Sequence, residues 1–134
     1  MALSKGILEL MNETSVAATA TVPTTVGGAE CGIIDTTETA TCALELEAVF
    51  NADGTASCVF HVRASTVGGT LATEWDTVDY DVATLACTPG LRAQMTIDVD
   101  ASPKYLTVFA VNEDGTYSMT SVKVTRAIQE VKPL

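Results

Sequence analysis

The sequence predicts an all-β domain, an antiparallel β-sandwich of about eight strands with a short N-terminal arm. Two features indicate this class: apolar and polar residues alternate along several segments, and Gly, Asp, Asn or Pro separates one segment from the next. Alternation with a period of two is typical of a strand that buries one face, because successive side chains point to opposite faces. Many short strands between turns favour a sandwich, and a jelly-roll strand order is one arrangement that fits.

The clearest strand signal lies in residues 42–50, where apolar side chains occupy the even positions and Glu45 and Glu47 face outward. Residues 57–64 show the same alternation, with His61 on the outward side. The Asp-Gly turn between the two segments predicts that they pair as a hairpin.

The other strands follow from the same reasoning. Residues 105–111 are apolar or Thr at every position, which predicts a central strand that is buried on both faces. A second turn of the Asp-Gly kind follows at 112–116. The remaining expected strands are residues 15–22, 30–35, 79–87, 94–99 and 117–126.

The chain of 134 residues is expected to form one domain, with residues 1–14 as an arm, 15–128 as the sandwich and 129–134 as a C-terminal tail. Hydrophobic residues make up 47% and charged residues 18%, which argues against a disordered acidic chain. The formal net charge of −10 argues against partners such as nucleic acid or an anionic membrane.

The N-terminal segment lacks the pattern of a signal peptide. Glu9, Asn12 and Glu13 interrupt its apolar residues, and no run in the chain is long enough for a membrane span. We therefore expect the protein to be made and assembled in the cytoplasm of its host.

The cysteines do not form a recognisable metal or redox motif, because no C-x-x-C pair occurs. We interpret them as small buried residues, with disulfides formed after release from the cell as the alternative. The four residues are Cys31, Cys42, Cys58 and Cys87.

No catalytic, cofactor-binding or metal site is predicted. His61 is the single imidazole, and its strand position faces it outward without a nucleophile motif nearby. The acidic residues of segment 76–81, and Asp98 with Asp100, are interpreted as solvated turn residues. Calcium at Asp98 and Asp100 or among the loop carboxylates is the alternative, because carboxylate oxygens suit that ion.

The aromatic residues Trp75 and Tyr80 lie between acidic residues and after a glycine loop. A Trp and a Tyr placed in this way predict either a sugar-stacking platform or an anchor for a protein contact. In the third interpretation, Trp75 closes the edge of the sandwich.

Two further groups are candidate interface residues. The arm carries Ile7, Leu8, Leu10 and Met11, which would be a liability if exposed in a monomer and are expected to dock on a neighbouring subunit or on the arm's own sandwich. The basic residues near the C-terminus, among them Lys123 and Arg126, are expected to contact the acidic first half of another copy, head to tail or in a trimer.

The order of several segments resembles small β-sandwich virion proteins of tailed bacteriophages and prophages. The arm is followed by a strand that runs into a glycine loop at 60–69, by Trp-Asp-Thr at 75–77, and by a late apolar strand at 104–111. The resemblance covers roughly residues 14–128. It implies a non-enzymatic structural role in the virion, as a capsid decoration protein or as a tail or fibre component.

The function expected from the sequence is therefore a capsid decoration protein that binds capsid or other virion proteins and forms a homo-oligomer, with a trimer favoured. The alternative is a carbohydrate-binding or adhesin-like sandwich, in which Trp75 and Tyr80 would form the platform.

Overall fold

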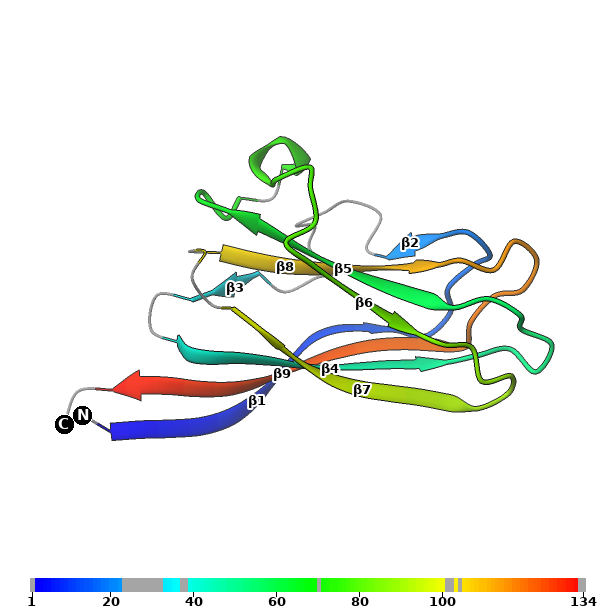
Figure 1. Cartoon of the computed structure of the whole chain (residues 1–134), viewed down its shortest axis with the longest axis horizontal. Helices are drawn as coiled ribbons and strands as arrows, with labels where there is room; N and C mark the ends of the chain where they lie inside the picture. The colour runs from blue at the N-terminus through cyan, green and yellow to red at the C-terminus, as the bar shows by residue number, and fades with distance from the viewer. Residues whose placement is uncertain are drawn as a thin grey trace.

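The computed structural model describes residues 2–22, 33–36, 39–69, 71–100, 103 and 105–132. Within these ranges nine strands form two antiparallel sheets, which confirms the predicted β-sandwich (Figure 1). Among the described residues, the single helical element is the short 3-10 helix η1. The elements are β1 (Ala2–Glu13), β2 (Thr21–Val22), β3 (Ile34–Asp35), β4 (Thr39–Val49), β5 (Cys58–Ser65), η1 (Ala72–Glu74), β6 (Asp81–Leu85), β7 (Arg92–Val99), β8 (Tyr105–Asn112) and β9 (Ser121–Lys132).

The two sheets face each other across the core. One has the strand order β1-β9-β4-β7, and the other has the order β2-β8-β5-β6, with β3 also paired to β8. The antiparallel pairs are nested along the chain: β5 pairs with β6, β4 with β7, β2 and β3 with β8, and β1 with β9. The same nested pairing would arise in one long antiparallel hairpin whose strands are divided between two sheets.

The hairpin predicted between residues 42–50 and 57–64 is wrong. These segments are β4 and β5, which lie in opposite sheets and do not pair with each other. Alternation determines which face of a strand is buried, and both strands bury one face in the same core, so the pattern is the same for a hairpin and for two facing strands. The Asp-Gly turn belongs to a longer connection that crosses from one sheet to the other.

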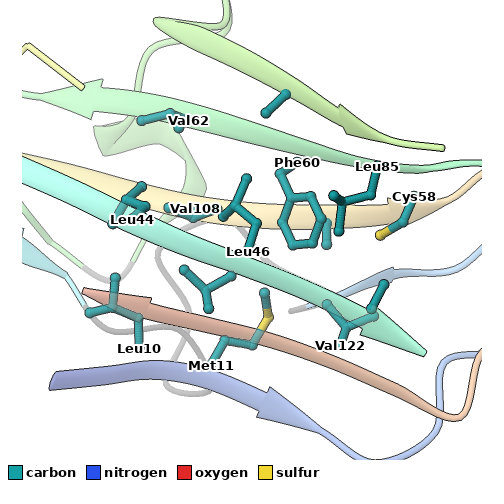
Figure 2. Close-up of a cluster of buried hydrophobic side chains, with 14 of the residues drawn as sticks. Leu10, Met11, Leu44, Leu46, Cys58, Phe60, Val62, Leu85, Val108 and Val122 are labelled. Carbon is teal, nitrogen blue, oxygen red and sulfur yellow. The ribbon is translucent and has the colours of Figure 1, made fainter. Parts of the chain in front are cut away.

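The core consists of the inward side chains of both sheets (Figure 2). Leu44 and Leu46 of β4 and Phe60 of β5 are completely buried, as the alternation predicts. Each such side chain contributes about 1.5–3 kcal/mol when it is removed from water. The predicted central strand is confirmed as β8, which lies between β5 and the short strands β2 and β3.

The segment expected as an arm forms β1, the edge strand of its sheet. Its register runs from Ala2 opposite Lys132 to Glu13 opposite Val122, with a bulge between Glu9 and Met11. The tail expected at 129–134 continues β9 as far as Lys132, so the first and last described segments of the chain form one strand pair.

A buried polar network joins the connections at one end of the sandwich. The Asn112 side chain donates to the carbonyl groups of Ala17 (3.2 Å) and Tyr117 (3.0 Å). Asp114 accepts hydrogen bonds from the backbone N–H of Thr55 (2.9 Å), 59 residues away, and of Thr116 (2.9 Å). These bonds tie the β4–β5 and β8–β9 connections together.

No helix in the described part of the chain is long and apolar enough to span a membrane.

Candidate interaction surface

The connection between β5 and β6 is an ordered loop because its backbone polar groups are satisfied locally. The Ser65 hydroxyl, at the end of β5, donates to the carbonyl of Glu74 (2.6 Å) and accepts from the N–H groups of Val67 (3.0 Å) and Gly68 (2.9 Å). One buried hydroxyl thus holds the start of the loop against its helical turn η1.

Gly68 allows the loop to pass close to the sheet. Its φ angle is 70°, in the left-handed region that favours glycine. A Cβ atom at this position would lie 2.6 Å from the ring of Tyr105 at the start of β8. The backbone conformation and the nearby Tyr105 ring therefore require glycine at position 68.

Trp75 is an internal support of the loop. Its side chain is only 4% exposed, and its indole Nε1–H donates to the carbonyl of Gly69 at 2.8 Å. A ring buried in this way does not offer a face for stacking on a sugar. That Trp75 closes the edge of the sandwich stays a prediction.

The end of the loop is attached to the outer face of the β2-β8-β5-β6 sheet by Asp79. Its carboxylate lies 2.6 Å from Arg63 Nε and 2.9 Å from His61 Nδ1, both on outward positions of β5. The His61 ring stacks on Phe109 of β8, with centroids 4.7 Å apart and planes 10° apart, and the Arg63 guanidinium lies 5.1 Å from the same ring. Burial raises the pKa of Asp79, but the hydrogen bonds and charges of His61 and Arg63 outweigh it, so the pKa lies below its ordinary value.

The sequence pattern places His61 and Arg63 outward but does not find this cluster. Alternation places both on the same face of β5. The third member of the cluster is Phe109, which is buried although it lies at an outward position of β8, opposite His61. Asp79 is brought in by the loop, whose course the sequence does not reveal.

Exposed apolar side chains are concentrated on this loop and on β6. The described residues include six exposed large apolar side chains, and five of them lie between Val67 and Val82; their exposure ranges from 38% to 76%. We call these five the β5–β6 apolar surface: Val67, Leu71, Val78, Tyr80 and Val82. The pKa of Tyr80 is raised by burial and by the carboxylates of Asp100 and Asp81.

The structure places the predicted interface residues in several different environments. Leu10, Met11, Trp75 and Arg126 are buried in their own chain. The side chains of Ile7 and Leu8 lie outside the described part of the structure, although their backbones pair with Ala127 and Arg126 in the sheet. Lys123 Nζ lies 3.7 Å from Oε2 of Glu9 in β1. Tyr80 is exposed on the β5–β6 apolar surface.

The cysteines and carboxylates add no further site. Cys42, Cys58 and Cys87 are free thiols, and Cys31 lies outside the described residues. Burial raises the pKa of Cys58 to about 12, with the charge of Glu113 adding to the effect. In the part of the chain that is described, no group of three or more His, Cys, Asp or Glu residues is placed to hold a metal ion.

No protein-family model matches the chain, and no curated protein matches it. Among solved structures, the chain is similar to PRD1 vertex protein P5, with 11% sequence identity and a TM-score of 0.45. The match covers 97% of this chain and 96% of that one.

Proposed function

We propose that this protein is a non-enzymatic structural protein of a virion, and that it decorates the capsid by binding a capsid protein through the β5–β6 apolar surface. The observation that carries the proposal is the concentration of exposed apolar side chains in one loop and its following strand. Single exposed apolar residues are normal on a soluble protein, whereas a group of them is typical of a protein–protein contact.

The chemistry of the surface is that of a protein interface. Val78 is the most exposed member, at 76%, and Tyr80 adds an aromatic ring with a polar group. Tyr is enriched in interfaces because its ring provides apolar area while its hydroxyl can still hydrogen bond.

The loop is also held in place before any partner binds. Ser65, Trp75 and Asp79 attach its start, its middle and its end to neighbouring residues. A surface that is already ordered loses less conformational entropy on binding, so more of its apolar contact becomes affinity.

The strand pairing supports the same role. The nested antiparallel pairs and the two four-strand paths agree with a jelly roll, an architecture that occurs in viral capsid and lectin domains. Among these two uses, the buried Trp75 does not favour sugar binding, and the exposed apolar surface favours a protein partner. The proposed location is therefore the virion.

The test is co-sedimentation with empty shells assembled from the major capsid protein of the virus or prophage that encodes this chain. The wild-type protein is expected to sediment with the shells. Val78→Asp and Leu71→Asp, which place a charge in the apolar contact, are expected to weaken binding at least about tenfold.

The matched control is Leu91→Asp. Leu91 is 60% exposed, almost as much as Leu71, but it precedes β7 and is not part of the β5–β6 apolar surface. It should bind like the wild type. Equal loss in all three variants would overturn the assignment of this surface, and binding to purified tails or fibres but not to shells would overturn the decoration role.

A further inference from the structure

The open edge of β7 is a second surface with a distinct character. Among the described strands, β7 pairs with β4 and has no neighbour on its other side. An open edge presents backbone N–H and C=O groups that can pair with a strand of another chain.

The other edges of the described sheets carry features that discourage such pairing. β1 has a bulge between Glu9 and Met11 and a lysine at position 5, β2 has two residues, and β6 has five. β7 has eight residues without Pro, Gly or Lys, and its register with β4 is unbroken. Natural proteins protect long edges by bulges, short length or charged side chains, above all lysines. On β7 the charged residues are confined to Arg92 and Asp98 near its two ends, so the backbone groups between them are open to a strand partner.

We propose that this partner is β7 of a second copy, paired antiparallel across a two-fold axis with Arg92 opposite Asp98 of the partner subunit. In this register Met95 lies at the axis, and Gln94 faces Thr96 of the partner subunit. The even-numbered side chains of β7 are exposed and the odd-numbered ones from 93 to 97 are half-buried, and the register keeps each set on its own face.

The charges on the strand select this register. Each copy contributes one Arg92 and one Asp98, so the two-fold axis produces two oppositely charged pairs, one at each end of the contact. Shifting the register between the two β7 strands by two residues places Arg92 opposite Thr96 of the partner subunit in one direction and opposite Asp100 of the partner subunit in the other. Asp100 lies beyond the end of β7 and already hydrogen bonds Tyr80.

Arg92 can make this contact without leaving its own sheet. It forms an ion pair with Glu47 of β4 through Nε, donates a hydrogen bond to Gln94 of its own strand, and is 55% exposed. A guanidinium has five N–H donors in a planar arrangement, so one face can serve Glu47 while another serves a carboxylate across the edge.

The proposed contact is independent of the β5–β6 apolar surface and can be separated from it. It is isologous, because the same strand is used by both copies, and it therefore closes as a dimer. The decoration role expected from the sequence favours a trimer, so the two expectations differ in a measurable mass.

The experiment is sedimentation velocity over a concentration series with the full chain and three variants. Wild type is expected to dimerise reversibly. Arg92→Glu and Asp98→Lys each place like charges opposite each other twice, and each should weaken dimerisation about tenfold or more. The double variant R92E/D98K restores opposite charges and should return the dissociation constant close to that of wild type.

The control variant is Glu113→Lys, in the exposed β8–β9 connection. It changes the net charge by the same amount as Asp98→Lys and should leave dimerisation intact. Asp98→Lys lowers the repulsion between two acidic copies, so a weaker dimer in this variant cannot arise from total charge.

Circular dichroism shows whether each variant is folded, and the double variant separates the pairing from any local effect of losing the Arg92–Glu47 contact. A monomeric wild type over the whole series, a trimer, or an Asp98→Lys variant that dimerises as well as wild type would each contradict the proposal. A double variant as weak as the single variants would also overturn it.

Discussion

Asp79 Oδ1 lies 2.6 Å from Arg63 Nε, although the two residues are 16 positions apart and belong to different elements. Arg63 projects from β5, and Asp79 comes at the end of the loop that precedes β6. Hydrogen bonds between charged groups are stronger than neutral ones, so this contact fixes the course of the loop that carries most of the exposed apolar side chains.

Replacing Asp79 by Ala should loosen the β5–β6 connection without unfolding the sandwich. The Asp79 side chain is 26% exposed, so the expected loss in free energy of unfolding is small, about 1 kcal/mol. Backbone amides of residues 66–80 should exchange faster with solvent deuterium, while those of β4 and β8 keep their protection.

Asp76→Ala is the control for this measurement. Arg63 uses the backbone carbonyl of Asp76 (3.1 Å), which the substitution retains. Exchange in the loop should then remain close to wild type, and equal acceleration in both variants would show that Asp79 does not hold the loop.

Asp114 should make the stability of the fold depend on pH on the acid side. Backbone N–H groups of Thr55, Tyr117 and Thr116 hold the pKa of this carboxyl at about 2, below its ordinary value of 3.8. A carboxyl whose pKa is lowered by folding stabilises the fold above its unfolded pKa, and this contribution is lost as the pH falls from about 4 towards 2.

The measurement is the urea midpoint of wild type and Asp114→Asn between neutral pH and pH 2. The variant should unfold at lower urea at neutral pH, and the difference from wild type should shrink as the pH falls. A difference that stays constant down to pH 2 would mean that the charge of Asp114 does not support the network.

Gly68→Ala should destabilise the protein by about 1–2 kcal/mol from its left-handed backbone alone, with the displaced Tyr105 ring adding to the loss. Chemical denaturation measures this directly. Gly115→Ala is the matched control, because a Cβ there would meet nothing within 4 Å. The control should change stability by no more than about 0.5 kcal/mol, and equal effects of the two substitutions would refute the geometric role of Gly68.

Phe60→Ala should cost about 3–5 kcal/mol, because it removes a fully buried ring from between the sheets. Val78→Ala, at the most exposed apolar position, should change the free energy of unfolding by less than about 0.5 kcal/mol. Calorimetric unfolding compares the two. A large loss in the free energy of unfolding for Val78→Ala would show that this side chain stabilises the fold, which would contradict its role as a free contact residue for a partner.

The sequence predicted the strands better than their partners. Alternation located β4 and β5, and the unbroken apolar run located β8, because each pattern reflects burial of one or both faces of a strand. The pairing of β4 with β7 and β9 depends on contacts between segments far apart in the chain, and burial alone does not encode it. The first segment has the same limit: Leu10 and Met11 lie in the core of their own chain.

The candidate surface was predicted only in part. Trp75 and Tyr80 were identified by residue type, but residue type does not distinguish a buried Trp that closes an edge from an exposed one. The Asp79 cluster combines a strand and a loop that becomes adjacent to it only after folding. Val67, Leu71 and Val78 gave no signal because they are separated by polar residues and follow no period.

The most direct test of binding through the β5–β6 apolar surface is electron cryomicroscopy of the decorated shells. We expect added density on the outside of the shell in which β6 and the loop from Val67 to Tyr80 face the capsid protein. Density attached through another face of the sandwich, or shells without added density at saturating protein, would contradict it.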